Sequence, residues 1–582
     1  MLQLILHITI ISAQCMLWGL PTLLFLKKSN PENDSSFWIR STAGLYCFLY
    51  FSGLIVLSFI TSFACLFVPL KFSYFLILTL GLVLFLIPNR KKMGLVLKQY
   101  SFKWKFNIIE SALIFICILM FILIGSLKPV NADTNIYHVQ IIKWFNEYGT
   151  VPGIANLFPR YGLGSNWFNL ISIFKIPFFT NNNYTWLNAT TVIWFFVWLF
   201  NNWKFHQNNA SLSIPSKVLS HLYLLIIFFG LFEWELFRDA ANSANYDFIV
   251  TALTIAIVLF LIEEILLPPN RRKFSFIFAI VCLSLIPLKL SGVFAILLLL
   301  YYLLSFKKAK YWIYCFIAGI LITIPFLIKN YIITGYPLFP VSLSFSSPDW
   351  QVPVAITDYL RQYIHVTNRF YNFSIDYKQI PELMHKSWIS LWLSGILIQQ
   401  KLIILGAITS LFVIVFKPSF LPDIKKLRIL FLLLFLMAVG WFFSAPSPRF
   451  GYGVLLILSF FPACLFFGRY ISTRLHQPVF LIAIAISCFY IYKKSSPIRS
   501  KPAYLVYPFA LDKPPGKKIN LDGIEFYLPE IINNGWMRDC YDSEVPCIYQ
   551  ENIYLNLRGK SIKDGFKITQ QPDRIFVRKY IY

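Results

Sequence analysis

Apolar segments of about 20 residues recur along most of this chain, and they restrict its fold more than any other feature. A helix of about 20 residues crosses a hydrocarbon core of roughly 30 Å. In lipid the backbone must satisfy its own hydrogen bonds, which favours helices over open strands. Because 57% of the residues are hydrophobic and only 13% are charged, a soluble fold could not bury all of these segments. We therefore expect an all-α polytopic membrane protein.

Hydropathy places about fourteen spans along the chain. They lie near residues 2–26, 41–69, 72–88, 106–126, 184–203, 216–234, 247–267, 273–288, 290–306, 311–333, 387–416, 428–445, 452–468 and 476–492. The PLKLSG stretch between the eighth and ninth spans could instead break one helix system. The N-terminal segment has no basic residues before its apolar run, so we interpret it as the first membrane helix and not as a cleaved signal peptide.

The distribution of positive charge predicts the orientation. The net charge is +26, but Lys and Arg crowd into short connectors that the predicted spans place on one side of the membrane; these are residues 90–105, 271–273, 307–310, 417–428 and 469–474. That side is cytoplasmic by the positive-inside rule, so a nucleic-acid partner is not expected. Both termini would then be extracytoplasmic, together with the segments 128–183, 235–246, 334–386 and 446–451.

The tail, residues 493–582, has the composition of a small extracytoplasmic α+β domain. Asp522-Gly523 between INL and IEFYL predicts a hairpin, because Asp-Gly suits a two-residue turn. The segments IYLNL and RIFVRKYIY also have strand character. Cys540 and Cys547 would face an oxidising compartment and could form a disulfide, although sequence spacing alone leaves this open.

The first outer loop, residues 128–183, carries the most varied polar groups. Thr134–Tyr148 has an apolar face and a polar face containing Gln140 and Lys143, which predicts an amphipathic helix on the membrane surface. Residues 165–178 predict a second interfacial helix. The loop is therefore expected to lie at the boundary between membrane and water.

Three residues are candidates for acid–base chemistry or for lining a site. Asp133 could cap the first surface helix, or act as a base on an acceptor hydroxyl, and the two interpretations are compatible. His138 follows five residues later and could face the same cavity or simply be an interfacial histidine. Asp247 opens the span after the polar loop 235–246, where it could be a helix cap or part of a site.

Three basic residues are candidates for binding an anionic substrate. Lys289 lies on the outer side, where the positive-inside rule gives no reason for a lysine, so it contacts either headgroups or a phosphate. Arg449 lies in the short PSPRFG turn and could bind a phosphate bidentately or contact headgroups. Arg160 is a further basic group of the first outer loop, and Asn330 is a polar candidate in KNYIITGYPLFP.

The sequence has no GxGxxG, P-loop, HExxH or GxSxG pattern. A transferase built on these residues would therefore need a donor that is already in the membrane, and not a nucleotide sugar.

Together these features resemble the GT-C fold of membrane glycosyltransferases, which use lipid-phosphate-linked sugars. The stretch DTNIYHVQIIKWFNEYGTVPG resembles the first outer loop of that family, ANYDFIVTALTIAI a later span that opens with an acid, and NYIITGYPLFP a segment that ends the family core. LKLSG resembles the lysine–small–small stretch of aminoarabinose-transferase-like members, which are related to protein-mannosyltransferase-like ones. More narrowly, VPG-x-x-NL-x-x-R-x-G, PSPRFG and the paired cysteines resemble an uncharacterised group of bacterial membrane proteins.

The resemblance implies a layout of the chain. Residues 1–105 would add three helices to a core at 106–340, followed by an outer loop at 341–386, further helices at 387–492 and the tail. The implied activity is sugar transfer from a polyprenyl-phosphate donor to an envelope glycan, lipid or protein at the outer face of the bacterial cytoplasmic membrane.

The resemblance also implies roles for the candidate residues. Asp133 would activate the acceptor; Lys289 and Arg449 would bind the donor phosphate; and His138, Arg160 and Asp247 would line the site. Thr134 stands where many relatives carry a second acid, which leaves open a divalent cation held by Asp133 and Asp247. An envelope polysaccharide polymerase or ligase, with 334–386 as its large late loop, is the first alternative. A transporter or flippase is the second, and would require paired mid-span charges and repeat symmetry.

Overall fold

The computed structural model describes residues 1–29, 37–99, 106–179, 183–211, 213–267, 274–306, 308–370, 375, 377–411, 424–468, 470–511, 513–521, 523–530, 539–570, 572–573 and 577. Parts of the predicted basic connectors (100–105, 271–273, 307, 417–423 and 469) therefore lie outside the described residues. So do Asp522 of the predicted hairpin turn and, except for Val577, the predicted last strand RIFVRKYIY.

A helix occurs at each of the fourteen predicted spans. They are α1 (Leu2–Ser29), α2 (Thr42–Ala64), α3 (Phe72–Gln99), α4 (Ile108–Gly125), α7 (Trp186–Asn208), α8 (Ile214–Phe232), α10 (Asp247–Leu266), α11 (Phe276–Leu288), α12 (Ala295–Leu304), α13 (Ala309–Thr334), α17 (Ile398–Thr409), α19 (Ile424–Ser444), α20 (Pro448–Phe467) and α21 (His476–Lys494). Among the described residues, ten helices are both long and apolar enough to cross a membrane. This supports a multi-pass membrane protein.

The number fourteen is not confirmed, and four helices account for the difference. Apolar helices α11, α12 and α17 are shorter than the other ten, and α7 carries Asn201, Asn202 and Lys204 in its second half. At PLKLSG the sequence left open a turn between two spans or a break in one helix system. In the structure α11 ends there, and the short helix η5 (Leu290–Phe294) and α12 follow, with Lys289 in an extended conformation between them. Helices α11 and α12 pack on each other, so the chain turns at this point.

Local sequence explains where several helices begin and how they pack. Ser41 caps α2 by accepting a hydrogen bond from the Gly44 N–H at 3.0 Å, and Asn107 and Glu110 form a capping box at the start of α4. Helices α1 and α2 approach closely where a Cβ on Gly53 would lie 1.7 Å from the Cys15 carbonyl oxygen. Small residues at helix contacts allow such close packing in membranes.

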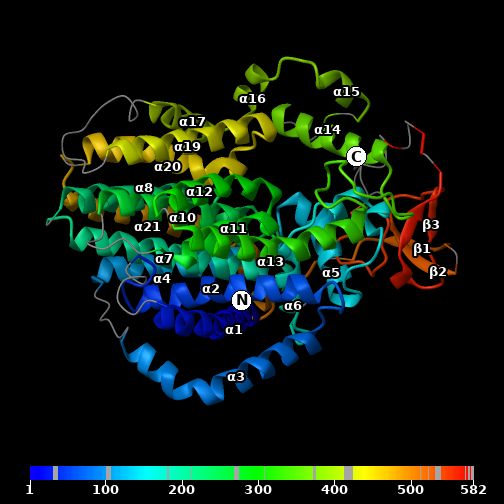
Figure 1. The fold of residues 1–582 in the computed structure, drawn as a ribbon, viewed down its shortest axis with the longest axis horizontal. Helices are drawn as coiled ribbons and strands as arrows, with labels where there is room; N and C mark the ends of the chain where they lie inside the picture. The colour runs from blue at the N-terminus through cyan, green and yellow to red at the C-terminus, as the bar shows by residue number, and fades with distance from the viewer. Residues whose placement is uncertain are drawn as a thin grey trace.

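The helices run roughly side by side, and the connecting segments with the most structure gather at one end, which we call the tail end (Figure 1). This end holds the first outer loop, with η1 (Thr134–His138), α5 (Val139–Glu147), η2 (Ile154–Asn156), η3 (Pro159–Gly162), α6 (Asn166–Ile173) and η4 (Asn183–Thr185). It also holds α14 (Val354–Phe370), η6 (Tyr377–Gln379), α15 (Ile380–Leu383) and α16 (Ile389–Gly395). The short helix α9 (Arg238–Ala241) lies between α8 and α10 in the chain.

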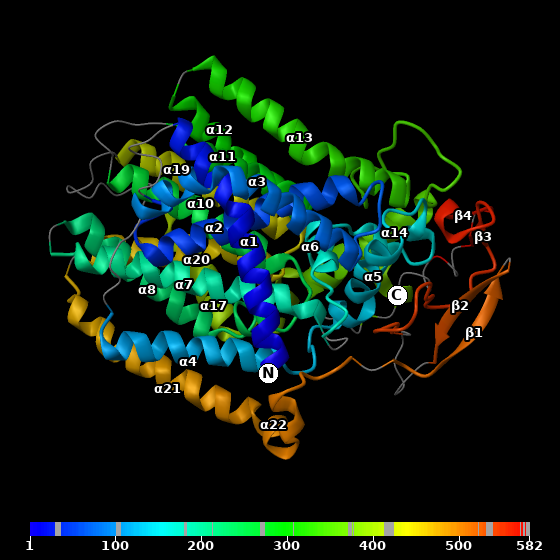
Figure 2. The same cartoon turned by 90° about the horizontal axis from the view of Figure 1, so that it is seen from below.

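Both views place the strands of the tail at the same end (Figure 2). The N-terminal amine donates to the Tyr504 carbonyl at 2.9 Å, so the start of α1 contacts the first part of the tail. The predicted outer segments and the tail thus lie together at one end of the helices.

The tail contains α22 (Ser496–Ser500), η8 (Pro502–Leu505) and η9 (Ile562–Asp564), with two separate antiparallel pairs of strands. Strands β1 (Gly516–Leu521) and β2 (Ile524–Pro529) pair Leu521 with Ile524, so the predicted hairpin is confirmed. Strand β3 (Leu555–Leu557) lies in the predicted IYLNL and pairs with β4 (Phe566–Ile568), which the sequence did not indicate. Cys540 and Cys547 form a disulfide with a Cα–Cα distance of 6.2 Å.

The first surface helix differs from its prediction. It begins as a turn of π-helix, η1, before α5. Its polar residues do not face water, since Gln140 and Lys143 are buried beneath the tail. The second helix, α6, is shorter than predicted and is buried on all sides. The first outer loop is therefore an interior layer between the helices and the tail.

Candidate functional site

A cavity of about 470 Å³ lies at the tail end, among helices α10, α11, α12, α13, α14, α19 and α20 and the short segments η1 and η3. All six predicted site residues line it: Asp133, His138, Arg160, Asp247, Lys289 and Arg449. Asn330 lines it as well. The volume is within the range of about 300–1,000 Å³ found for small-molecule sites.

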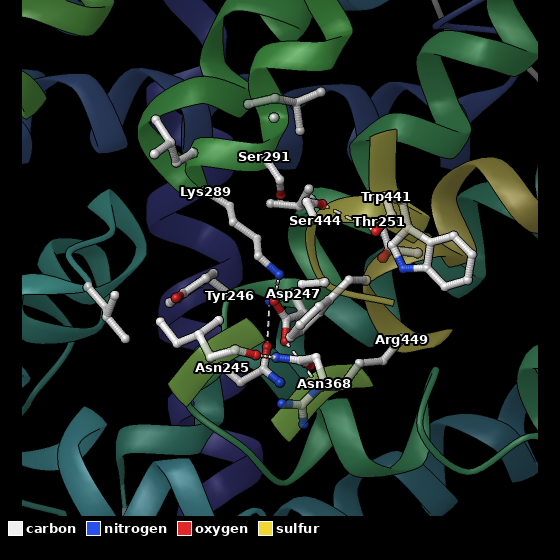
Figure 3. Close-up of a pocket in the computed structure, with 18 of the residues that line it drawn as sticks. Asn245, Tyr246, Asp247, Thr251, Lys289, Ser291, Asn368, Trp441, Ser444 and Arg449 are labelled. Carbon is white, nitrogen blue, oxygen red and sulfur yellow. Dashed lines mark hydrogen bonds and ion pairs between the residues drawn. The ribbon is translucent and has the colours of Figure 1, made fainter. Parts of the chain in front are cut away.

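Asp247 and Lys289 form the closest ion pair of the cavity. Asp247 is the first residue of α10, and Lys289 is the extended residue that follows α11. The Lys289 Nζ lies 2.7 Å from Asp247 Oδ1, and Figure 3 shows the amine pointing at that carboxylate. The backbone N–H of Asp247 donates to the side-chain oxygen of Asn245, so Asn245 accepts a hydrogen bond from the first N–H group of α10. The Asp247 carboxylate is thus directed at charged groups.

Arg449 joins the two carboxylates of the cavity. Its Nη2 lies 3.5 Å from Asp133 Oδ2, and its Nε lies 3.6 Å from Asp247 Oδ2. Pro448 starts α20 directly before it, and the preceding turn is held by Trp441, whose indole N–H donates to the Ser447 carbonyl at 2.8 Å. The predicted short turn between two helices is present at residues 445–447, but Arg449 itself lies in the first turn of α20.

Asp133 does not cap the helix that follows it. Within the described part of the chain its side chain makes no capping hydrogen bond, so the cap interpretation is wrong. Its Oδ1 lies 3.8 Å from Arg160 Nη1 instead. Burial alone raises the pKa of Asp133, but the charges of Arg449 and Arg160 outweigh it and hold the pKa below its ordinary value. The carboxylate is therefore ionised at neutral pH.

The five charged residues form one chain of ion pairs: Arg160, Asp133, Arg449, Asp247 and Lys289. Every carboxylate oxygen of the two acids faces a cation. Three cations against two carboxylates leave the residues that line the cavity with a net charge of +1 (3 − 2). Residues far apart in sequence thus build a compact site with a surplus of positive charge.

His138 lines the cavity but belongs to an aromatic cluster. Its ring lies 4.9 Å from the Phe168 ring and 6.1 Å from the Tyr246 ring, and it is 2% exposed. Its Nδ1 has no hydrogen-bond partner among the described residues. Burial lowers the pKa of His138 to about 4, so the ring is neutral at physiological pH. A neutral histidine can accept or donate a hydrogen bond here but adds no charge.

The residues do not fit the divalent cation that the sequence left open. Arg449 occupies the position between Asp133 and Asp247 where a bridging metal ion would have to lie. Among the residues that the structure describes, no group of three or more His, Cys, Asp or Glu side chains is placed to bind a metal. The guanidinium takes the place of a metal in joining the two acids.

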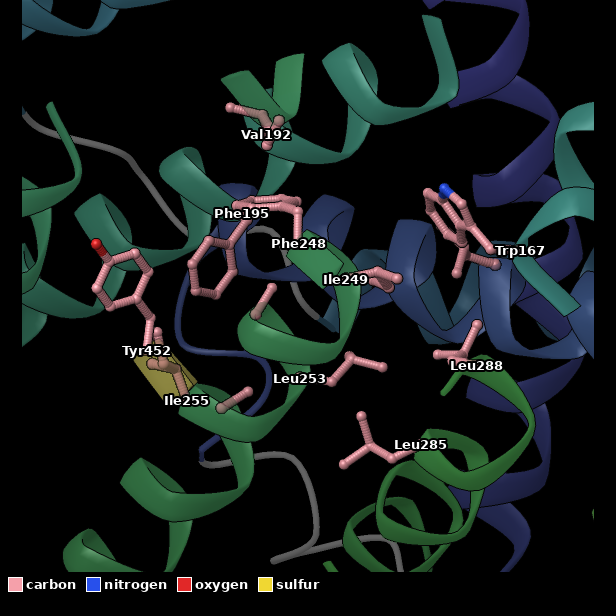
Figure 4. Close-up of a cluster of buried hydrophobic side chains, with 14 of the residues drawn as sticks. Trp167, Val192, Phe195, Phe248, Ile249, Leu253, Ile255, Leu285, Leu288 and Tyr452 are labelled. Atoms are coloured by element: carbon pink, nitrogen blue, oxygen red, sulfur yellow. The ribbon is translucent and has the colours of Figure 1, made fainter. Parts of the chain in front are cut away.

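Away from the charges the cavity lining is mainly apolar, with Thr251, Thr254 and Ser291 among its polar residues. On α10 the lining continues from Asp247 to Val250 and Thr254, about 10 Å further along the helix. Leu285 of α11 and Met437 of α19 line the same inner part. Phe248 and Leu253 of α10 are themselves buried in a hydrophobic cluster, which fixes the position of this helix (Figure 4). The cavity has a charged head and an apolar body.

Sequence reasoning missed the residues that α14 adds to the site. Tyr363, Thr367 and Asn368 line the cavity, and the Arg160 guanidinium lies 5.1 Å from the centre of the Tyr363 ring. The pattern of apolar residues in 354–370 would have indicated a helix. Its contact with a loop almost two hundred residues earlier has no signal in the sequence.

These features define a multi-pass membrane protein with a charged, apolar-walled cavity at one end of its helices. Residues 1–456 match the family described as a domain of unknown function (DUF8201), and the chain belongs to this family. No curated protein and no solved structure matches the chain.

Proposed function

We propose that the protein is a membrane glycosyltransferase that moves a sugar from a polyprenyl-phosphate donor to an acceptor of the cell envelope. The acceptor is a glycan, a lipid or a protein, and the reaction occurs at the outer face of a bacterial cytoplasmic membrane, where the tail end would lie. The observation that carries this proposal is the chain of five charged residues at the head of a cavity whose remaining lining is mainly apolar.

The charged head suits a phosphodiester. Lys289, Arg449 and Arg160 supply three cations, and arginine binds phosphate oxygens in a bidentate manner. Arg449 and Arg160 lie 3.5–3.8 Å from the carboxylates, longer than a tight ion pair. A phosphate can therefore compete for them without breaking short hydrogen bonds. The net charge of +1 matches the single negative charge of a sugar-phosphate-lipid diester.

The apolar body suits the lipid part of the donor. The polyprenyl chain would lie along Val250, Leu285 and Met437, with its phosphate at Lys289 and Arg449. In this orientation the sugar faces Asp133 and Arg160.

Asp133 is the base of the proposed reaction. The acceptor hydroxyl attacks the anomeric carbon with inversion, and the new C–O bond forms while the bond from that carbon to the phosphate oxygen breaks. The electron pair leaves with polyprenyl phosphate, whose charge Lys289 and Arg449 stabilise. The hydroxyl proton passes to the Asp133 carboxylate, which its cationic neighbours keep ionised beforehand.

A polysaccharide polymerase or ligase is the second candidate. Helix α14, which lies in the late loop 334–386, supplies Tyr363 and Asn368 to the cavity. A large late loop at the site suits a long acceptor chain. Product length separates the two candidates: a transferase adds one sugar per acceptor, whereas a polymerase or ligase transfers an oligosaccharide.

The test uses purified protein in liposomes with a panel of polyprenyl-phosphate-linked hexoses and pentoses. Mass spectrometry measures released polyprenyl phosphate and glycosylated acceptor in an envelope extract. We expect release by the wild type, loss of at least a hundredfold in Asp133→Asn, and little change in Asp358→Asn, which replaces an acid of α14 outside the cavity lining. Equal rates in wild type and Asp133→Asn, or no release with any donor, would refute the proposal.

A further inference from the structure

A disulfide-closed segment of the tail lies against the first outer loop. We call residues 540–549 the tail loop. It starts at Cys540, is closed by the disulfide to Cys547, and is joined to β2 by two backbone hydrogen bonds of 2.9 Å, Tyr527 N–H to Pro546 and Ile548 N–H to Tyr527. Both Cys540 and Cys547 are fully buried. The tail loop is thus fixed to the rest of the tail.

The polar face of α5 binds the backbone of the tail loop. Lys143 Nζ donates to the Ser543 carbonyl at 2.6 Å and to Asp542 Oδ1 at 3.1 Å. Gln140 Nε2 donates to the Tyr541 carbonyl at 3.0 Å. Because Lys143 is 7% exposed and Gln140 is fully buried, these side chains depend on the tail loop for their hydrogen bonds.

Tyr549, at the end of the tail loop, contacts the segment that follows Asp133 and the segment that carries Arg160. Its hydroxyl donates to the carbonyl of Ile136, in the turn η1 that directly follows Asp133. Its ring stacks on Phe158 at a centroid distance of 3.9 Å, and Tyr161 donates to its hydroxyl at 3.4 Å. Phe158 and Tyr161 flank Arg160, so one tyrosine joins the two sides of the Asp133–Arg160 pair.

We propose that the tail loop is a clamp that holds Asp133 and Arg160 in place in the cavity, with Tyr549 as its positioning residue. Tyr549 does not line the cavity itself and acts through η1 and η3. The clamp fixes the geometry of the site whatever the substrate is. Its effect on catalysis rests on the function proposed above.

The first test does not depend on any activity. Hydrogen–deuterium exchange is measured on the full chain in nanodiscs for wild type, Tyr549→Phe and the control Tyr554→Phe, which removes another tail hydroxyl that donates to Asp573. We expect exchange in the peptide 131–148 to be about fivefold faster in Tyr549→Phe, from the loss of one buried hydrogen bond. In Tyr549→Phe, exchange in residues 553–570 and in α10 should not change. Unchanged exchange in 131–148, or an equal increase in Tyr554→Phe, would overturn the clamp.

The Lys143–Asp542 ion pair offers a rescue test. Lys143→Asp should accelerate exchange in 131–148, and the combined variant Lys143→Asp with Asp542→Lys should restore part of the protection, because the pair is re-formed with its charges exchanged. A double variant that is no better protected than Lys143→Asp would count against the clamp. The variant Cys540→Ser with Cys547→Ser should resemble Tyr549→Phe if the disulfide fixes the tail loop.

A pH profile of sugar transfer separates positioning from a general loss of folded protein. Asp133 faces Arg449 from α20, Arg160 from η3 and His138 from its own turn. If Tyr549→Phe releases Asp133 from these neighbours, the pKa of Asp133 rises and the acidic limb of the pH–rate profile moves to higher pH. A smaller folded fraction would lower the rate and leave the limb in place. If exchange changes as expected while the wild type transfers no sugar, the clamp stands and the proposed function fails.

Discussion

Replacement of Arg449 by glutamine tests the charged head of the cavity most sharply. Arg449 has two roles in the proposed complex: it binds the phosphate, and it separates the phosphate from Asp133 and Asp247. A hydrogen bond to a charged group contributes about 1.5–3 kcal/mol, so the first role alone is worth roughly tenfold to 150-fold in affinity, at about 1.4 kcal/mol per tenfold.

The second role increases the loss. Without the guanidinium, Asp133 Oδ2 and Asp247 Oδ2 face the phosphate directly. A like-charge contact at about 4 Å costs about 4 kcal/mol at an effective dielectric constant of 20. The Asp133 side chain is 32% exposed, so screening reduces this repulsion to about 2 kcal/mol. Together the two effects amount to about 3.5–5 kcal/mol and predict a loss of roughly 300-fold to 4,000-fold.

A double-mutant cycle separates the two roles. Asp133→Asn in the Arg449→Gln background removes the repulsion of about 2 kcal/mol and should recover roughly 30-fold of the lost affinity. The assay is a titration of protein in nanodiscs with a short-chain isoprenyl phosphate, followed by microscale thermophoresis. Arg558→Gln is the matched control, since it pairs with Asp349 outside the cavity. Affinity within threefold of wild type in Arg449→Gln, or a double variant that binds no better than the single one, would refute this reasoning.

Three further predictions follow from the same geometry. Asp247→Asn frees Lys289 from its 2.7 Å partner and should tighten isoprenyl phosphate binding by about tenfold in the same titration; weaker binding would contradict it. Arg449 lowers the pKa of Asp133, so the stability that this carboxylate contributes is present above its unfolded-state pKa and is lost as pH falls through its lower folded-state pKa. The pH profile of the initial transfer rate should therefore show no limb from Asp133 between pH 5.5 and 8. Arg449→Gln should move the acidic limb of that profile to higher pH, and an unmoved limb would count against the pairing. Glu263→Ala removes the carboxylate that pairs with the buried Arg40 guanidinium and should destabilise the protein by about 3–5 kcal/mol. The melting temperature should fall while the affinity for isoprenyl phosphate stays the same. An unchanged melting temperature would refute this prediction.

Hydropathy predicted the positions of the helices well because burial in lipid leaves a local signal. Each predicted span coincides with a helix, yet within the described part of the chain ten of these helices are clearly long and apolar enough to cross a membrane. Helix α7 shows the limit: Asn202 and His206 lower its hydropathy, but both are buried among neighbouring helices. A window of sequence does not record whether a polar side chain faces lipid or another helix.

The site was predicted residue by residue but not as a network. Asp133 has the local pattern of a helix cap, and only the fold brings Arg449, 316 residues later, to 3.5 Å from it. The polar face of α5 looks the same in sequence whether water or protein covers it, and the covering group, Asp542, lies 399 residues away from Lys143. Pairings of this length depend on how helices pack, which no short motif encodes.

The measurement that tests the central claim most directly is a structure of the protein in nanodiscs with a bound polyprenyl phosphate. The proposed function predicts a phosphate between Lys289 and Arg449, with the isoprenyl chain along Val250 and Met437 and the space beside Asp133 open for a sugar. A phosphate bound elsewhere, or a cavity in which Lys289 and Arg449 keep their carboxylate partners at saturating ligand, would contradict it.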